Sequence, residues 1–179
     1  MPEIEIRPVL PADLSVLAAL DHSCEAEYVW QMERQFEEGQ MSFSFRQVRL
    51  PRKVMVDYPR PVELLQQERF ERLAVLVAVM GGRPVGYVRL KDDVLPGAAW
   101  LSDLVVDTLA RRKGIGTALV LAGQQWAVQH RLRRMILEMS SKNHPATSLA
   151  ARLGYEFCGY HDHYYTSQHI AIFFAQFLR

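Results

Sequence analysis

The amino-acid sequence predicts an α+β fold, a mixed α/β domain of three layers, and two observations carry this prediction. In the first half of the chain, short alternating or continuous apolar runs are joined by turn residues, which is typical of antiparallel hairpins. In the second half, apolar runs of strand length alternate with segments of helical period, and this order does not favour a doubly wound parallel sheet. The 179 residues are expected to form one domain over 1–179, and 49% of them are hydrophobic, enough for a core.

The first half is expected to be largely extended. Its predicted elements are a strand over 3–9, a short helix that begins after Pro11, and extended segments over 28–32 and 41–46. Residues 50–72 are harder to interpret because three prolines interrupt them. The last part of that stretch, 63–72, is polar enough to form an exposed helix.

The second half contains the stronger local patterns. Residues 73–80 form a continuous apolar run, so this strand is expected to be buried on both faces, and Gly81 and Gly82 then turn the chain into a hairpin. The remaining predicted elements are strands over 85–90, 100–106, 135–139, 157–165 and 170–178, and helices over 114–130 and 143–154. Alternation in strand 100–106 predicts two faces: Trp100, Ser102, Leu104 and Val106 on one, and Leu101, Asp103 and Val105 on the other.

Composition narrows the classes of partner and the compartment. Lys and Arg number 21 against 20 Asp and Glu, and a net charge of +1 argues against general capture of nucleic acid or an anionic membrane. Two cysteines are few for a disulfide framework, which favours a reducing, cytoplasmic setting. The N-terminal residues do not resemble a signal peptide, and no run reaches the roughly 18 apolar residues of a membrane span.

The stretch ARRKGIGTAL, residues 110–119, predicts an anion site between a strand and a helix. The first N–H groups of a helix lack intrahelical partners, and the helix dipole adds positive potential there. Glycine lets a ligand approach the backbone, and three cations precede the helix. A P-loop needs four residues between its glycines, and a dinucleotide fingerprint needs a third glycine where Leu119 stands, so both patterns fail on spacing. A capped helix start beside a solvated turn is the alternative interpretation.

Two motifs together resemble the GNAT superfamily of acyl-CoA-dependent acetyltransferases. The segment 111–116 fits the superfamily's Arg/Gln-x-x-Gly-x-Gly/Ala signature, and 143–155 resembles its second motif, Asn-x-x-Ala-x-x-Leu-Tyr-x-Lys/Arg-x-Gly-Phe/Tyr, at a typical separation. The likeness extends from about residue 4 to the end of the chain. A weaker likeness to the streptothricin acetyltransferase branch rests on the segments 20–23, 27–29, 45–50 and 157–160.

The resemblance implies a central, mostly antiparallel sheet that is partly splayed, with acetyl-CoA as co-substrate in the opening. Backbone groups of the strand before the loop would meet the pantetheine arm and the thioester, and the loop amides would hold the pyrophosphate. The residues implied in acetyl-CoA binding are Leu104, Val105, Val106, Arg111, Arg112, Lys113, Gly114, Ile115, Gly116, Thr117 and Asn143. Asn143 is also a favoured helix N-cap, and the two roles are compatible.

The groups for proton transfer depart from the family pattern. The family's usual acid is a tyrosine at the position of Ala150, and the streptothricin branch commonly carries a carboxylate at a position that matches Val105. A CoA thiol with a pKa on the order of 8.5 leaves with little help, so catalysis is still expected. The predicted catalytic residues are Asp103 and Glu138, either acting as base through a water, and Tyr164 as acid, with Tyr160 and Tyr165 as further candidates. Ion-paired carboxylates and packed aromatic rings are the alternatives.

The acceptor side and the metal question rest on weaker signals. Segment 28–45 is expected to line the acceptor side, with Trp30, Glu27 and Glu33 as contacts for a cationic amine, although core packing explains Trp30 as well. His161 and His163 would share a strand face, but no further ligand completes a metal site. Strand 170–178 is apolar enough to be the edge of a homodimer or simply a buried strand.

The expected function is acetyl transfer from acetyl-CoA to a primary amine of a small molecule, such as an aminoglycoside-like or streptothricin-like antibiotic. The amine would attack directly in a ternary complex, because no nucleophilic Cys or Ser motif suggests a covalent intermediate. Two alternatives stay open at this point: acetylation of a protein or peptide amine, and a non-catalytic acyl-CoA-binding module, for which Ala150 and Val105 are the evidence.

Overall fold

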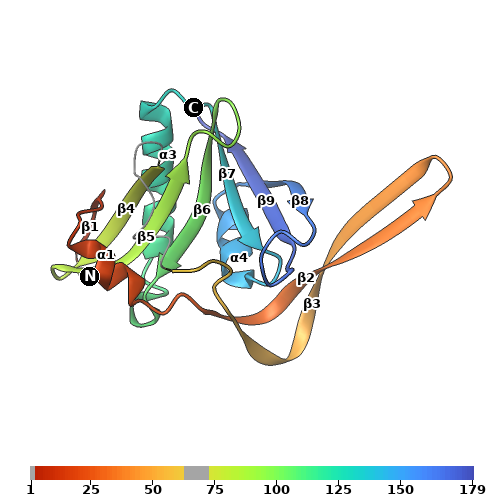
Figure 1. The fold of residues 1–179 in the computed structure, drawn as a ribbon, viewed down its shortest axis with the longest axis horizontal. Helices are drawn as coiled ribbons and strands as arrows, with labels where there is room; N and C mark the ends of the chain where they lie inside the picture. The colour runs from red at the N-terminus through yellow and green to blue at the C-terminus, as the bar shows by residue number, and fades with distance from the viewer. Residues whose placement is uncertain (1–2, 63–72) are drawn as a thin grey trace.

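The computed structural model describes residues 3–62 and 73–179, which build a seven-stranded sheet and a two-stranded arm (Figure 1). The sheet order is β1-β4-β5-β6-β7-β9-β8, and every neighbouring pair is antiparallel except β6 and β7. Its strands are β1 (Ile4–Pro8), β4 (Leu73–Met80), β5 (Arg83–Lys91), β6 (Ala98–Val106), β7 (Arg134–Ser140), β8 (Glu156–His161) and β9 (Ala171–Phe177). The prediction of an α+β fold with a mostly antiparallel sheet is confirmed.

Helices cover both faces of this sheet. The short helix α1 (Asp13–Ala18) packs on one face, where Leu17 meets Tyr87 and Val105 in one hydrophobic cluster. The other face carries α3 (Ile115–Gln129) and α4 (His144–Arg152), and a larger cluster lies beneath them. The result is the expected three layers (Figure 1).

The two long helices begin where the sequence places their caps. Gly114 is the N-cap of α3 and has a φ of 82°, a left-handed conformation that suits glycine. A short 3₁₀ turn, η2 (Thr108–Ala110), joins β6 to this loop. Asn143 caps α4, where its Oδ1 accepts a 3.1 Å hydrogen bond from the Ala146 amide.

Strands β6 and β7 separate halfway along their length. Their parallel pairing runs from Ala98 beside Arg134 to Leu101 beside Leu137 and is not continued beyond that point. The C-terminal half of β6 therefore pairs only with β5. This opening is the predicted splay of the sheet.

A β-bulge in β6 changes the predicted alternation. The register against β5 shifts between Arg89 opposite Asp103 and Leu90 opposite Leu101, so Ser102 is an extra residue. As a result, Leu101 lies with Leu104 in the core beneath α3, on the face opposite Asp103. The prediction that Leu101 and Asp103 share a face is wrong, because a strand pattern alone does not reveal a bulge.

The aromatic segments form one long arm, β2 (Cys24–Glu37) and β3 (Gln40–Val56), which reaches well beyond the sheet (Figure 1). The two strands are longer than the predicted segments 28–32 and 41–46. Pro51 does not end β3, because it falls where the register shifts around Ala26 and Tyr28 and no ladder partner is required. The inner part of the arm is held by a 2.8 Å hydrogen bond from the Trp30 amide to the Ser141 carbonyl.

The end of the chain also differs from its prediction. Strand β8 stops at His161, and the following residues form a turn in which His163 has a φ of 51°. Strand β9 pairs with β7 on one side and β8 on the other, so the idea that it is a free dimer edge is wrong. The helix predicted over 63–72 lies outside the described residues.

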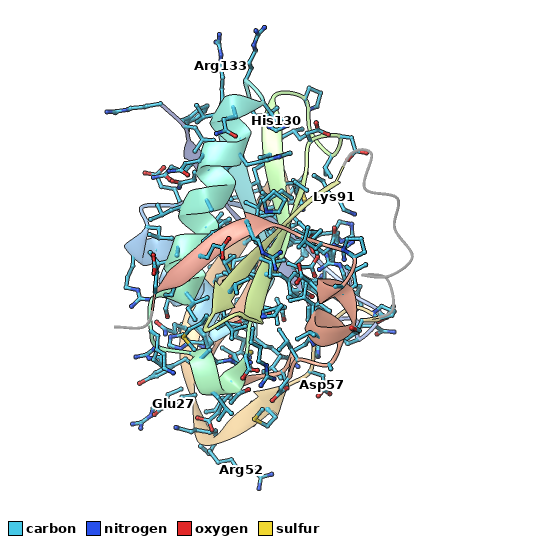
Figure 2. The ribbon with its side chains drawn as sticks, turned by 90° about the vertical axis from the view of Figure 1, so that its left-hand side faces the viewer. Glu27, Arg52, Asp57, Lys91, His130 and Arg133 are labelled. Atoms are coloured by element: carbon cyan, nitrogen blue, oxygen red, sulfur yellow. The ribbon has the colours of Figure 1, made fainter. Side chains whose placement is uncertain are left out.

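Charged side chains such as Arg52, at the bend of the arm, and Arg133, at the opposite end of the molecule, point away from the body (Figure 2). Of the helices in the described part of the chain, none has the length and apolar character to cross a membrane.

Candidate active site

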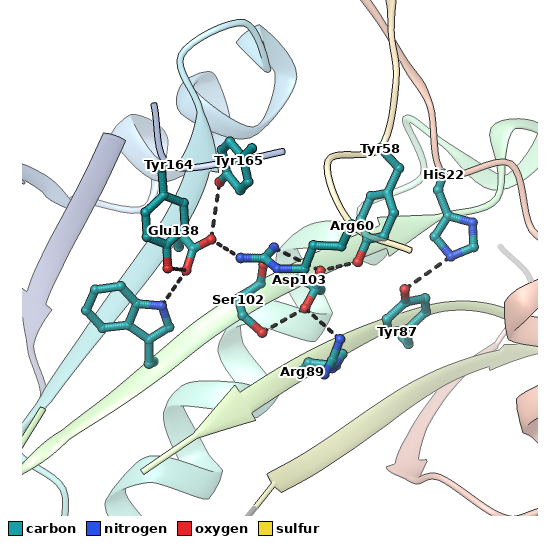
Figure 3. Close-up of polar contacts among 11 residues, drawn as sticks. His22, Tyr58, Arg60, Tyr87, Arg89, Ser102, Asp103, Glu138, Tyr164 and Tyr165 are labelled. Carbon is teal, nitrogen blue, oxygen red and sulfur yellow. Dashed lines mark hydrogen bonds and ion pairs between the residues drawn. The ribbon is translucent and has the colours of Figure 1, made fainter. Parts of the chain in front are cut away.

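A pocket of about 70 Å³ lies in the opening between β6 and β7. Its walls come from the two separated strands, from the start of α4 and from the segment that follows β3. Four predicted site residues line it, namely Asp103, Glu138, Leu104 and Asn143, together with Tyr58 and Arg60. Figure 3 shows the polar side chains at this place.

Asp103 is almost fully buried and makes four polar contacts. Ser102 Oγ donates a 2.7 Å hydrogen bond to Asp103 Oδ2, and the Tyr58 hydroxyl donates to Oδ1. Two guanidinium groups form ion pairs with the carboxylate, Arg89 at 3.3 Å and Arg60 at 3.2 Å. A buried carboxylate needs this charge compensation. In the resting protein Asp103 is therefore an ion-paired carboxylate, which was the alternative to a catalytic base.

Glu138 on β7 is equally buried and is surrounded by donors. Trp100 Nε1 donates a 2.7 Å hydrogen bond to Oε2, and the hydroxyls of Tyr164 and Tyr165 donate at 3.1 Å and 3.2 Å. The Arg60 Nη2 group completes the set with an ion pair to Oε1. The closing turn therefore packs directly over β7 at the pocket.

Arg60 joins the two carboxylates into one cluster (Figure 3). Burial lowers the pKa of Arg60, but the charges of Asp103 and Glu138 outweigh that effect, so its pKa lies above the ordinary range and the group is always charged. The two acids predicted from separate strands are thus brought to either side of one guanidinium.

The tyrosines of the cluster are proton donors at neutral pH. Burial is the main cause that raises the pKa of Tyr164, and the neighbouring Glu138 raises it further. Burial also raises the pKa of Tyr165. Tyr164 is 39% exposed and Tyr165 only 6%, yet Tyr165 lines the pocket, whereas Tyr164 contacts Glu138 from the adjoining turn. Tyr160, by contrast, packs against Phe43 and Phe45 of the arm.

The two positions that depart from the family pattern, Ala150 and Val105, have buried side chains. Ala150 is fully buried in the main core cluster. The Val105 side chain is 4% exposed and belongs to the cluster beneath α1. Neither position bears a side chain that can transfer a proton.

The predicted anion site lies at the start of α3. The N-terminus of α3 has no side-chain cap at Gly114, and Arg112, Lys113 and Gly114 are exposed. The Arg111 guanidinium donates to three backbone carbonyls, of Val106 at 2.9 Å, Asp21 at 3.1 Å and Ser23 at 2.7 Å. Arg111 therefore ties the end of β6 to the chain after α1.

The predicted acceptor contacts are dispersed along the arm. Glu27, which is half-buried, and the exposed Glu33 form ion pairs across the arm with Arg49 and Arg46, both at 2.7 Å. Trp30 Nε1 donates a 3.3 Å hydrogen bond to Thr147 on α4. His161 and His163 do not gather ligands, and in the part of the chain that the structure describes no three His, Cys, Asp or Glu side chains are placed to hold a metal ion.

Sequence reasoning missed four polar residues of the site: His22, Tyr58, Arg60 and Arg89. His22 lines the pocket and lies 3.1 Å from the Tyr87 hydroxyl, through Nε2. The sequence contained one signal for Arg60. Asp103 and Glu138 were predicted to lie near the groove without a cationic partner, and Arg60 is an isolated cation between Pro59 and Pro61.

The fold is shared with several solved acetyltransferases. Nourseothricin acetyltransferase has a TM-score of 0.84 at 20% identity, over 98% of this chain and 99% of that one. A proposed streptothricin acetyltransferase from Bacillus anthracis str. Ames, solved in complex with acetyl coenzyme A, has a TM-score of 0.76 at 19% identity, over 98% and 100%. The ribosomal-protein-S18-alanine N-acetyltransferase of Escherichia coli reaches 0.69 at 17% identity, over 98% and 94%. At these identities the likeness shows the fold, and no curated protein matches in sequence.

A family model matches the sequence over residues 29–155, well over half of the chain, and is that of the acetyltransferase (GNAT) family. The matched region contains the loop before α3, the opening between β6 and β7, and the start of α4. Motif, fold and groove therefore agree: the chain belongs to the GNAT family of acetyltransferases.

Proposed function

We propose that this protein transfers the acetyl group of acetyl-CoA to a primary amine of a small, cationic molecule by direct attack in a ternary complex. The observation that carries the proposal is the opening between β6 and β7, which has an uncapped helix N-terminus near one end and two buried carboxylates inside.

The co-substrate would lie along the unpaired edge of β6. Leu104, Val105 and Val106 have no strand partner on the β7 side, so their backbone groups would meet the pantetheine arm and the thioester, apart from the Val106 carbonyl, which accepts from Arg111. The amides of 112–117 would hold the pyrophosphate at the start of α3, with Lys113 adding charge. Asn143 lines the same pocket while it caps α4, so its amide group is well placed for the pantetheine.

The chemistry needs a base, an oxyanion donor and an acid. The acceptor nitrogen attacks the thioester carbonyl carbon, and a β6 amide stabilises the negative oxygen that develops. The attacking nitrogen loses a proton to Asp103 or Glu138 through a water, and the C–S bond breaks. Tyr164, which keeps its proton at neutral pH, protonates the departing thiolate.

The nature of the acceptor follows from the polar lining of the pocket. Two acids, ion-paired with Arg60 and Arg89, and several hydroxyl groups surround a volume of about 70 Å³. This lining suits an amine on a small polar molecule better than an apolar one. Nourseothricin acetyltransferase, whose fold is so similar, supports an antibiotic of the streptothricin type as the first acceptor to test.

Thiol release provides the test. The protein is incubated with acetyl-CoA and a panel that contains streptothricin, aminoglycosides, simple diamines and N-terminal alanine peptides, and free thiol is measured. The proposal predicts thiol release that saturates with a small cationic amine. Release with peptides alone would favour a peptide acetyltransferase, and a rise in melting temperature with CoA but no release with any amine would favour a non-catalytic binding module.

A further inference from the structure

Arg60 differs from the other charged members of the buried cluster in where it comes from. The carboxylates and Arg89 stand on β5, β6 and β7, at the centre of the sheet. Arg60 instead reaches in from the segment that follows β3, between two prolines, and its side chain is 20% exposed against 0% for Asp103 and 1% for Glu138. It is the cation of the cluster that meets solvent.

Counted over the described residues, the charges of the cluster balance only with Arg60 in place. Asp103 and Glu138 contribute two negative charges, and Arg89 and Arg60 two positive charges. Among the described residues, Arg60 is the only cation paired with Glu138, whose other partners are the neutral donors of Trp100, Tyr164 and Tyr165. A further cation in the same pocket would gain no net attraction, because the charges of these four residues already cancel, and Arg60 would repel it.

The contacts of the guanidinium are those that an ammonium group also makes. Arg60 Nη1 donates to the Ser102 carbonyl at 2.9 Å and to Asp103 at 3.2 Å, and Nη2 donates to Glu138. Its Cζ lies 5.4 Å from the centre of the Tyr165 ring, within the range of a cation–π interaction. Three oxygen acceptors and one aromatic face match the three N–H donors of a primary ammonium.

We propose that the space between Asp103 and Glu138 is a cation seat, occupied by Arg60 in the resting protein, and that a primary ammonium or guanidinium group of the acceptor takes this place by displacing the Arg60 side chain. Its assignment to the acceptor rests on the proposed acetyl-transfer function. The seat lies in the same pocket as Leu104 of β6, so a cation bound there is held beside the expected thioester.

Chemical rescue of Arg60→Ala tests the seat without acetyl-CoA or turnover, so its result can be read even if no amine is acetylated. The variant is titrated with n-butylammonium chloride in the millimolar range, and its melting temperature is followed. Tetramethylammonium chloride, which has no N–H donor, and sodium chloride are the controls at equal ionic strength. The matched variant is Arg52→Ala, since Arg52 is an exposed arginine on the arm.

The proposal predicts that Arg60→Ala melts several degrees below the wild type and that butylammonium raises its melting temperature in a saturable way. Neither control salt should do so, and half-saturation in the wild type and in Arg52→Ala should need at least tenfold more butylammonium. The double variant Arg60→Ala/Glu138→Gln should regain stability and lose the response. If Arg60→Ala is recovered unfolded, butylammonium but not tetramethylammonium must restore folded protein during refolding. Equal responses to the three salts, or an equal response in the wild type, would overturn the proposal.

Discussion

The Tyr164 hydroxyl donates a 3.1 Å hydrogen bond to Glu138 Oε2, which joins the turn after β8 to the wall of the groove. Tyr165, next in the chain, donates to the other oxygen at 3.2 Å but is almost fully buried. One carboxylate thus has an accessible and an inaccessible phenol as neighbours. Because Tyr164 is the more exposed of the two, we propose Tyr164 rather than Tyr165 as the proton donor.

We expect Tyr164→Phe to lower kcat by about 10²-fold, because general acid catalysis contributes roughly 10² to 10⁴ in rate. Its melting temperature should fall less than that of Tyr165→Phe, since Tyr164 is 39% exposed and water can replace the donor that Glu138 loses. Tyr165→Phe is the paired variant and should chiefly lower the free energy of unfolding, by about 1–3 kcal/mol, because a buried charge loses a donor. Steady-state kinetics and urea denaturation of both variants check this prediction, and wild-type kcat in Tyr164→Phe would exclude Tyr164 as the acid.

Gly116→Glu should abolish the stabilisation of the protein by acetyl-CoA. A carboxylate at the second residue of α3 would stand where the pyrophosphate is expected and would repel it. A Cβ at Gly116 meets Leu149 Cδ2 at 3.4 Å, a side-chain end that can move, so the fold should persist. Leu121→Glu, at an exposed position later in the same helix, is the control and should bind acetyl-CoA like the wild type. Isothermal titration provides the measurement, and unchanged binding by Gly116→Glu would remove this loop from the site.

Gly86→Ala should destabilise the protein and distort the β6 wall of the groove, because Gly86 lies on the neighbouring strand β5. The added Cβ would lie 2.6 Å from the Val105 carbonyl oxygen and 3.2 Å from Val106 Cα, both backbone atoms of β6. Overpacking of this kind costs about 1–3 kcal/mol, and here it also displaces the strand that is expected to bind the thioester. Gly159→Ala is the matched variant in β8, since its nearest neighbour is Phe173 at 3.8 Å. Urea denaturation should show a loss in the first variant and little change in the second.

The stability of the protein should fall as the pH drops below 6.5. Burial lowers the pKa of His22 below its ordinary value of 6.5, and this effect exceeds that of the hydrogen bond between Nδ1 and the Leu20 carbonyl. Because the unfolded chain then binds more protons than the folded one, the contribution of His22 is complete above pH 6.5 and is lost as the pH falls toward its folded-state pKa. His169, whose pKa burial also lowers, acts in the same direction.

His22→Asn should therefore make the free energy of unfolding depend less steeply on pH between 6.5 and 5. The amide of asparagine can keep the bond to the Leu20 carbonyl. Gln40→Asn, at an exposed position without a titratable group, serves as the control and should leave the slope as it is. An identical slope in wild type and His22→Asn would show that His22 is not the titrating group.

Local patterns in the sequence predicted the parts of the fold that depend on neighbouring residues. The apolar period and the caps at Gly114 and Asn143 were enough to locate α3 and α4, because a helix start is decided by a few adjacent residues. The bulge at Ser102 was not predictable, because it is a property of pairing with β5 rather than of β6 alone. The length of the arm was not predictable for the same reason, because it depends on how β2 and β3 pair around Pro51.

The candidate site likewise contains residues that the sequence predicted and residues that it did not. Asp103, Glu138 and Asn143 were predicted from motif and strand position, and the structure places all three around one pocket. Arg60 was missed because its role depends on where the segment after β3 returns to the sheet, and sequence separation hides that contact. A buried acid with no predicted partner is the physical signal that calls for such a cation.

If the carboxylates in the groove serve acetyl transfer to an amine, thiol release depends on Asp103 and Glu138, and the variants Asp103→Asn and Glu138→Gln measure this dependence. Each variant is first checked for acetyl-CoA binding by titration and then assayed with an acceptor that the wild type turns over. We predict that both bind acetyl-CoA as the wild type does and that at least one loses about 10²-fold in kcat through the missing base. Wild-type kcat in both variants would contradict the claim and move the chemistry away from the opening between β6 and β7.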